Sequence, residues 1–169
     1  YVFDGYWLDI GTEDTFFKAN LALADSRDGF DFHDVSNPIY THPRNLPVSC
    51  VQAAEMDRVV ITNGCLLGRS KLKRCVIGLR SVVGNDVELE NVVLMGADYF
   101  EDEVLRQSNH EGSVPDVGIG DGTVIRDAII DKNARIGRNV NLSPQGLPDG
   151  PLQDGLHVRD SVLVVEKNA

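Results

Sequence analysis

The chain has 169 residues and a mass of 18.5 kDa, which is enough for a domain whose core needs no disulfide or metal. Its 16 basic and 26 acidic residues give a formal charge of −10, which disfavours nucleic acid as a partner because phosphate backbones would be repelled. The sequence has neither an apolar run near the roughly 20 residues of a membrane helix nor a signal-peptide pattern, so we expect no membrane or secretory role. It opens at Tyr1 in the middle of a pattern, and we therefore expect a piece of a longer polypeptide.

The first segment contains most of the aromatic residues and one helix signal. Thr12 precedes two acidic residues, the combination of capping hydroxyl and negative charge that favours a helix start, and we expect a short helix through Leu21. Residues 25–47 are polar and proline-containing, with an Asp28–Gly29 turn, which is typical of an extended linker. We place a domain boundary near Pro47.

Aliphatic residues then recur at about every sixth position, a period that neither a helix nor a strand gives. Glycine often follows the periodic residue, as in Ile77-Gly78 and Ile136-Gly137. These are hexapeptide repeats. Similar segments beginning at Leu72 and Leu89 start 17 residues apart, which fits one coil of a parallel β-helix, usually left-handed, although the period does not itself prove the hand. The expected core positions are Val60, Leu66, Leu72, Ile77, Val83, Leu89, Met95, Ile119, Ile125, Ile130, Ile136 and Leu142.

Two stretches break this rhythm and are predicted to be loops leaving the solenoid. Residues 96–118 include an acidic, helix-compatible stretch at 101–106, and residues 143–157 are rich in proline and glycine. Each loop could contact a partner or be tolerated decoration.

Other chemistry is sparse in the sequence. The cysteines, Cys50, Cys65 and Cys75, have no metal spacing, and we interpret them as reduced thiols in the core. No Walker-type loop occurs, the glycines of 118–122 follow from the repeat, and the four histidines form no ligand pair. By itself the chain looks like a module that serves catalysis done elsewhere.

Four blocks carry a family resemblance: Gly-Tyr-Trp-Leu-Asp-Ile-Gly-Thr at 5–12, Ile-Tyr-Thr-His-Pro-Arg-Asn-Leu-Pro at 39–47, Gly-Ala-Asp-Tyr at 96–99 and Ile-Asp-Lys-Asn-Ala-Arg-Ile-Gly at 130–137. They resemble glucose-1-phosphate adenylyltransferase, or ADP-glucose pyrophosphorylase, in its cyanobacterial and plant form. The resemblance implies a mainly β fold, a left-handed parallel β-helix preceded by a short α/β remnant of a Rossmann-like nucleotidyltransferase domain. Residues 1–24 would end the catalytic domain, 25–47 would be the linker, and 48–169 would be the regulatory and oligomerisation domain.

The resemblance also implies an activity. The family makes ADP-glucose and pyrophosphate from ATP and glucose 1-phosphate with Mg²⁺, for glycogen or starch synthesis, in the bacterial cytoplasm or the plastid stroma. It forms homo- or hetero-tetramers that 3-phosphoglycerate activates and phosphate inhibits. The family's nucleotide loop and sugar-phosphate lysine lie upstream of Tyr1, so we expect this chain alone to be inactive.

Particular residues match the family's functional positions. Asp9 matches a catalytic, metal-binding aspartate, and a carboxylate of this kind can hold Mg²⁺ against phosphates. Lys132 and Lys167 match two activator-binding lysines, and Arg44 matches a phosphate-binding arginine. The predicted effector-binding residues also include Asp131 and His42, although relatives often carry another polar residue at His42. For any single lysine or arginine, a solvated surface charge is the competing interpretation.

Three alternatives stay open at this stage. A hexapeptide-repeat acyltransferase would form a trimer, bind coenzyme A between coils and use His110 as its base. A β-helix scaffold would supply only a subunit interface. Another sugar-phosphate nucleotidyltransferase would share the layout, although the Asp-Lys-Asn-Ala-Arg block at 131–135 disfavours it.

Overall fold

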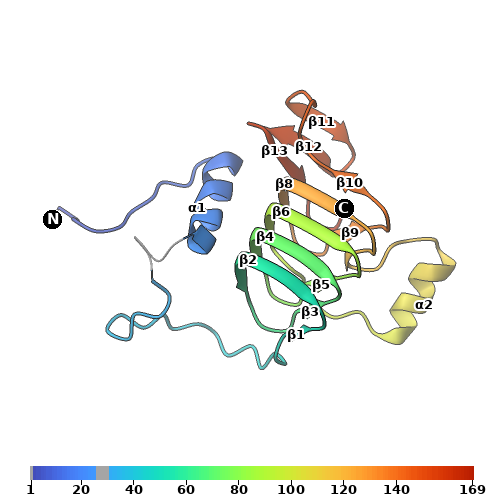
Figure 1. Cartoon of the computed structure of the whole chain (residues 1–169), viewed down its shortest axis with the longest axis horizontal. Helices are drawn as coiled ribbons and strands as arrows, with labels where there is room; N and C mark the ends of the chain where they lie inside the picture. The colour runs from blue at the N-terminus through green and yellow to red at the C-terminus, as the bar shows by residue number, and fades with distance from the viewer. Residues whose placement is uncertain (1, 26–30) are drawn as a thin grey trace.

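The computed structural model describes residues 2–25 and 31–169, so that Tyr1 and the predicted Asp28–Gly29 turn lie outside the described residues. From residue 50 onward the chain winds into stacked coils joined by parallel pairing (Figure 1). One sheet contains the short strands β1 (Cys50–Val51), β3 (Leu66–Leu67), β5 (Val82–Val83), β7 (Gly118–Ile119) and β9 (Arg135–Ile136).

The second sheet contains the long strands of the same coils. In chain order these are β2 (Ala54–Ile61), β4 (Ser70–Ile77), β6 (Val87–Leu94) and β8 (Val124–Ile130). The next coil is divided between β10 (Asn141–Leu142) and β13 (Val162–Val165), which pair with the first and second halves of β8. The solenoid is therefore a parallel β-helix, as the hexapeptide pattern predicts.

Each long strand turns a corner at one residue with left-handed backbone geometry. These corner residues are Arg58, Arg74, Asn91 and Asp127, with φ between 50° and 54°. Successive corners also contact each other through side chains: the Asn91 amide donates to the Asp127 carboxylate at 2.8 Å. Because of the corners, one long strand forms two faces of the coil, and the short-strand sheet forms the third.

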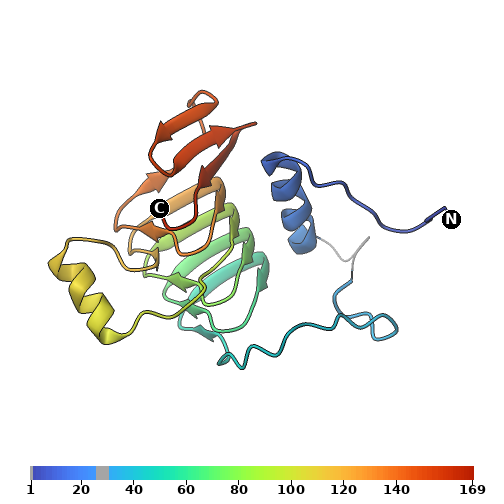
Figure 2. The same cartoon turned by 180° about the vertical axis from the view of Figure 1, so that it is seen from behind.

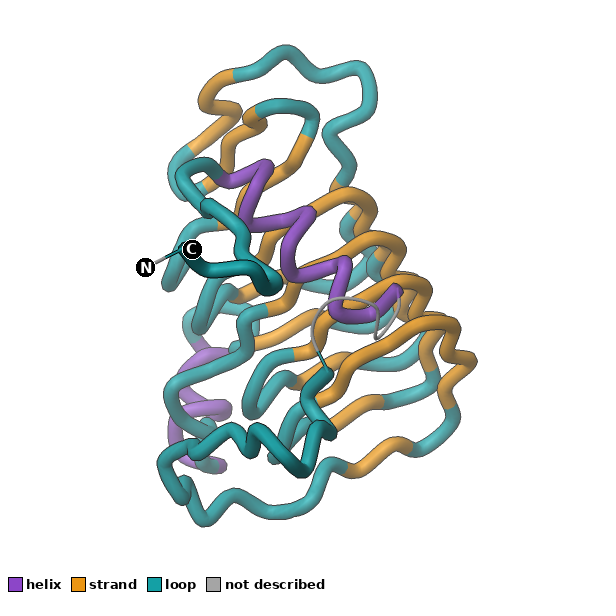
Figure 3. Tube along the Cα trace, turned by 90° about the vertical axis from the view of Figure 1, so that its left-hand side faces the viewer, coloured by secondary structure: helices purple, strands orange, loops and turns teal. Residues whose placement is uncertain are grey.

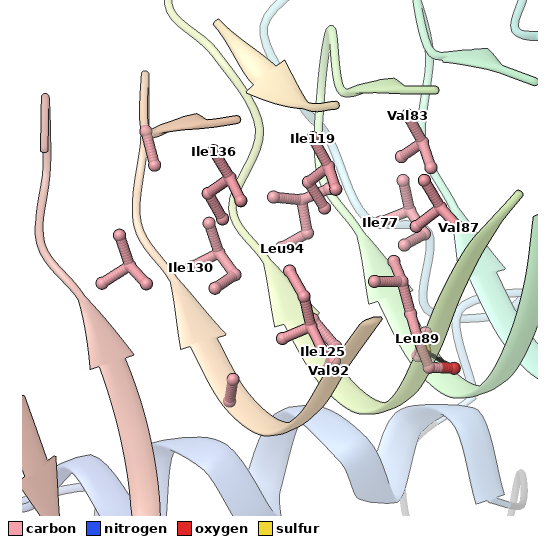
Figure 4. Packing of buried hydrophobic residues seen from close by; sticks show 14 of the residues in the cluster. Ile77, Val83, Val87, Leu89, Val92, Leu94, Ile119, Ile125, Ile130 and Ile136 are labelled. Carbon is pink, nitrogen blue, oxygen red and sulfur yellow. Dashed lines mark hydrogen bonds between the residues drawn. The ribbon is translucent and has the colours of Figure 1, made fainter. Parts of the chain in front are cut away.

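Three stacked aliphatic columns, which the strand pairing defines, form much of the core, together with other buried residues such as Val87 and Val92 (Figure 4). Leu72 pairs with Leu89, so this coil has the predicted 17 residues. The columns are Val51, Leu67, Val83, Ile119 and Ile136; Met56, Leu72, Leu89, Ile125 and Leu142; and Ile61, Ile77, Leu94, Ile130 and Val165.

The columns correct three of the predicted core positions by one residue. Leu66 is 43% exposed whereas Leu67 is 1% exposed, because Leu67 is the residue that pairs with Val83. In the same way the column contains Ile61 where Val60 was predicted, and Leu94 where Met95 was predicted. Where two adjacent residues are both apolar, the register of strand pairing decides which one faces the core, because neighbouring strand residues point to opposite faces of the sheet.

The prediction for the cysteines is correct at two positions and wrong at one. Cys65 and Cys75 are buried free thiols, but Cys50 is exposed. Cys50 pairs in register with Leu66, which is also exposed, whereas its neighbour Val51 pairs with the buried Leu67. The Cys50 side chain therefore points out of the coil.

Helix α1 (Glu13–Asp25) lies across the outside of the solenoid (Figure 3). The predicted cap is confirmed, because the Thr12 hydroxyl accepts the Thr15 N–H at 3.2 Å. The helix continues beyond the predicted end at Leu21 to Asp25, whose carboxylate accepts from Arg74 at 2.7 Å. Before β1, the described residues contain this helix and no strand.

An apolar cluster attaches α1 to the long-strand sheet. Phe17 and Leu21 of the helix pack against outward-facing residues of the strands, including Val93, Ile129 and Val164. Burying two such side chains contributes roughly 1.5–3 kcal/mol each. The first segment is therefore fixed to the β-helix by packing in addition to the chain connection.

The first predicted interruption, 96–118, holds helix α2 (Glu103–Glu111), which lies on a different side of the solenoid from α1 (Figure 2). Its base is anchored by Glu101, which is 9% exposed and accepts from the Val117 N–H at 2.8 Å and from Arg135 at 2.6 Å. The segment 96–118 is therefore attached to the solenoid by the hydrogen bonds and the ion pair of Glu101.

The second predicted loop, 143–157, is wrong in part. It contains β11 (Gly150–Gln153) and the start of β12 (Leu156–Arg159), which pair antiparallel and continue onto β13. Edge strand β11 tolerates Pro151, because an edge residue can lack an N–H. Among the described residues no helix is long and apolar enough to cross a membrane.

Candidate functional site

Strand pairing at the end of the solenoid brings two distant lysines together. Ile130 of β8 pairs with Val165 of β13, and each strand leads into a similar tetrapeptide, Asp-Lys-Asn-Ala at 131–134 and Glu-Lys-Asn-Ala at 166–169. Backbone hydrogen bonds continue the pairing into these turns, since the Asn168 N–H donates to the Lys132 carbonyl at 3.0 Å. Lys132 and Lys167 consequently occupy equivalent positions in successive coils.

Asp98, from the preceding coil, joins the two lysines. Its Oδ1 lies 2.9 Å from Lys132 Nζ, and its Oδ2 lies 2.9 Å from Lys167 Nζ. Asn133 makes two further contacts: its Nδ2 donates to Asp98 Oδ2 at 3.2 Å, and its Oδ1 accepts the Asp98 N–H at 2.8 Å. These four residues, Lys132, Lys167, Asp98 and Asn133, form the lysine cluster. The lysine and aspartate side chains are 39–49% exposed, so the cluster is open to solvent.

The charges of this cluster stabilise one another. The hydrogen bonds from Lys132, Lys167 and Asn133 hold the pKa of Asp98 well below its ordinary value. The bond to Asp98, with a smaller effect of the Asp131 charge, raises the pKa of Lys167. The Asp98 carboxylate and the Lys167 ammonium are therefore both ionised near neutral pH. Because the two lysines outnumber the one aspartate, the three side chains carry a net positive formal charge.

A glycine lets the chain reach this arrangement. Gly96 has φ +89°, and a Cβ at this position would lie 2.1 Å from the Leu79 carbonyl oxygen. The Gly96 carbonyl accepts the Asn133 N–H at 3.1 Å. The close approach at Gly96 fixes the backbone two residues before Asp98.

Asp98 is the functional candidate that the sequence analysis missed. The Gly-Ala-Asp-Tyr block at 96–99 was part of the family resemblance, and an acidic residue in this block, two positions after Gly96, was the available signal. Asp131, which was predicted, has a local role: its Oδ1 accepts the N–H of Lys132 at 2.6 Å, which orients the turn that carries this lysine.

Arg44 and His42 are not part of the lysine cluster. Both are exposed in the extended segment before β1. Within residues 2–25 and 31–169, neither side chain forms a hydrogen bond or an ion pair. Their assignment to effector binding stays a prediction.

Asp9 is exposed in the extended segment that precedes α1. Across the described ranges it has no hydrogen-bond or ion-pair partner, and no group of three or more metal-ligating side chains occurs there. One isolated carboxylate does not make a Mg²⁺ site, since the ion needs six ligands and usually takes protein carboxylates together with phosphates and water. The described residues of this chain do not by themselves fit the ion, and we derive no catalytic step through it.

A second charged cluster connects α1 to the segment that carries Lys167. His157 of β12 lies with Nε2 3.2 Å from Glu13 Oε1 and with Nδ1 3.2 Å from Glu166 Oε1. Arg159 approaches the same glutamate of α1, with Nε 3.6 Å from Glu13 Oε2. Glu13 begins the helix and Glu166 immediately precedes Lys167, so these contacts link the first segment to the lysine cluster.

His110, the base predicted in the acyltransferase alternative, lies at an exposed position. Its Nε2 lies 3.6 Å from Asp116 Oδ2, beyond hydrogen-bond distance, and its side chain is 71% exposed.

The stacked coils and their aliphatic columns define a parallel β-helix of the hexapeptide-repeat class, with the lysine cluster at one end. The family model described as GLGC left-handed parallel beta-helix domain matches residues 44–169, and the chain belongs to this family. This domain is the C-terminal part of glucose-1-phosphate adenylyltransferase, a nucleotidyltransferase. The match confirms the resemblance and the left-handed β-helix, and it favours this enzyme over an acyltransferase, which would share only the solenoid.

Proposed function

We propose that this chain is the regulatory and subunit-interface part of an enzyme that makes ADP-glucose and pyrophosphate from ATP and glucose 1-phosphate. In this proposal phosphorylated metabolites control the enzyme by binding at Lys132 and Lys167. The observation that carries it is the approach of both ammonium groups to a single carboxylate at 2.9 Å, in a β-helix of the adenylyltransferase family.

The chemistry of the cluster suits a phosphoryl group. Ammonium groups are compact donors that form charge-assisted hydrogen bonds with phosphoryl oxygens. Asn133 adds a neutral donor beside the lysines. We expect 3-phosphoglycerate to act as an activator and inorganic phosphate as an inhibitor, since both present such oxygens.

Activation in this account is differential binding. An effector shifts an equilibrium only when it binds one arrangement of the protein more tightly than the other. The contacts from Lys167 through Glu166 and His157 to Glu13 offer a physical route from the cluster to α1. We infer that the effector stabilises the arrangement in which α1 and the β-helix hold the catalytic domain active.

The remaining parts of the proposal concern the whole enzyme. It would be a homo- or hetero-tetramer in the bacterial cytoplasm or the plastid stroma, and it would serve glycogen or starch synthesis. Asp9 would supply one carboxylate to Mg²⁺, with the other ligands coming from outside this chain. The chain alone would be inactive.

The test is pyrophosphate release from ATP and glucose 1-phosphate with Mg²⁺, measured on the intact protein with and without 3-phosphoglycerate. Lys132→Glu and Lys167→Glu should each raise the 3-phosphoglycerate concentration for half-maximal stimulation by about tenfold or more, the equivalent of one lost charge-assisted bond. Lys71→Glu is the matched control, because Lys71 is an exposed lysine of the long-strand sheet whose Nζ lies 4.0 Å from Glu88. Equal effects of all three changes would contradict the assignment of the site.

A further inference from the structure

We propose that Asp98 is a built-in competitor for the anion site: its carboxylate occupies the place between Lys132 and Lys167 that a phosphate-bearing effector takes, and the effector binds by displacing it. This inference rests on the proposed function. It assigns Asp98 a role in setting the effector concentration to which the protein responds.

The contact between Asp98 and the two lysines has the shape that a bound anion would have. Each Asp98 oxygen faces a different ammonium group, Oδ1 toward Lys132 and Oδ2 toward Lys167, both at 2.9 Å. Two oxygens of a phosphoryl group would approach the same pair of donors in the same way. The Asp98 carboxylate thus takes the donors that an incoming anion needs.

The Asp98 side chain can leave the lysines while its backbone stays in place. The backbone is held by the bond from the Asp98 N–H to Asn133 Oδ1 at 2.8 Å and by the bond from the Ala97 N–H to the Leu79 carbonyl at 2.8 Å. The side chain is 39% exposed, so a rotated carboxylate would be hydrated. Displacement therefore requires a rotation of the side chain and no unfolding of the coil.

Electrostatics also favours exchange of the Asp98 carboxylate for the effector over binding of both. A second anion added beside an ionised Asp98 would be repelled by it, and like charges at short range disfavour each other. A phosphate dianion carries more charge than a carboxylate, so it competes for two cations more effectively than Asp98 does. The protein would then bind multiply charged phosphate esters in preference to singly charged anions.

The opposite role for Asp98 is also testable. If Asp98 served only to position the lysines for an effector, removing its charge would let the two ammonium groups repel each other and separate. Phosphate would then bind more weakly to the neutral variant. The competitor and the positioning roles therefore predict changes of opposite sign.

The experiment is calorimetric titration of inorganic phosphate into the intact protein and its variants. Asp98→Asn keeps the shape of the side chain and removes its charge, and Asp98→Ser is a second variant in case the first fails to fold. Asp86→Asn is the control. Asp86 is an exposed aspartate away from the lysine cluster, and its Oδ2 lies 2.7 Å from Arg69 Nη2. Its left-handed backbone, with φ 57°, tolerates asparagine. Lys132→Glu reports whether phosphate binds at the proposed site.

We expect phosphate to bind Asp98→Asn about three- to tenfold more tightly than it binds the unaltered protein, because the anion no longer has to displace an ion-paired carboxylate. Asp86→Asn should bind like the unaltered protein. Unchanged or weaker binding to both Asp98 variants, with binding still lost in Lys132→Glu, would overturn the competitor role and leave the proposed function standing. Phosphate binding that is absent, or that survives Lys132→Glu, would overturn both.

Discussion

Ile130 pairs in register with Val165, and this pairing sets the distance between the two lysines that follow them. Asn133 and Asn168, which are 35 residues apart in the sequence, come within 3.0 Å of each other for the same reason. A slip of one residue in this register would turn the side chains of one strand to the opposite face. The lysine cluster is thus a consequence of how the last coils stack.

The register can be tested with two adjacent leucines. Leu67→Ala should lower the free energy of unfolding by about 2–5 kcal/mol, because a fully buried leucine leaves a cavity when truncated. Leu66→Ala is the matched control and should change it by less than about 1 kcal/mol, since Leu66 is 43% exposed. Chemical denaturation of the two variants measures both values. Similar losses would contradict the assignment of Leu67 to the column.

The attachment of α1 depends on Asp25. Its carboxylate receives hydrogen bonds from Arg74, the nearest at 2.7 Å, and from Arg58 at 3.0 Å. We expect Asp25→Asn to speed amide hydrogen exchange in α1 and to leave exchange in β6 and β8 unchanged. Exchange that stays slow in α1 would show that the apolar contacts of Phe17 and Leu21 suffice.

The same residue gives α1 a defined pH dependence. The hydrogen bond from Arg74 is the main reason that the pKa of Asp25 lies below its ordinary value in the folded protein. The stabilisation is therefore fully present above the unfolded pKa and is lost as the pH falls through the folded pKa. The difference in melting temperature between the unaltered protein and Asp25→Asn should shrink as the solution is acidified through this range. A difference that stays constant with pH would contradict the role of the ionised pair.

The three cysteines should react at very different rates. Burial raises the pKa of the Cys75 thiol to about 11, and Cys65 is also buried, whereas Cys50 is exposed on β1. Iodoacetamide treatment near pH 8 followed by mass spectrometry should show one rapid modification, at Cys50, and two more only after unfolding. Rapid modification of Cys75 in the folded protein would contradict its packing in the core, where it pairs with Val59 and Val92.

The α2 excursion should open when its anchor is removed. Glu101 is the buried partner of Arg135 at 2.6 Å and also accepts from Asn109 at 3.0 Å. Breaking a buried ion pair typically costs about 3–5 kcal/mol. We expect Glu101→Ala to make residues 97–117 susceptible to limited proteolysis while the long strands stay protected. Glu103→Ala, at an exposed position of the same helix, is the control.

The sequence predicted the solenoid because its pattern is local. The glycines beside periodic aliphatic residues can be recognised within the sequence of a single coil. The cap at Thr12 likewise lies within a few residues of the helix that it begins. The choice between Leu66 and Leu67 was not predictable, because both are leucine and only the pairing with Val83 distinguishes them. The exposure of Cys50 depends on the same register, because Cys50 pairs with the exposed Leu66.

The candidate site was predictable only in part. Lys132 and Lys167 stand in recognisable motifs, but Asp98 joins them from a third segment, and side-chain contacts between coils depend on the three-dimensional stacking. The hairpin of β11 and β12 was missed for the same reason, because it joins the sheet through the pairing of β12 with β13. Packing of α1 on the solenoid required contacts between residues far apart in the sequence.

The central claim is that an anion binds between the two lysines in place of Asp98. A crystal structure of the intact protein with 3-phosphoglycerate tests it most directly. The account predicts a phosphoryl group within hydrogen-bond distance of Lys132 Nζ and Lys167 Nζ, with the Asp98 carboxylate turned toward solvent. A phosphoryl group bound elsewhere, with Asp98 still between the lysines, would contradict it.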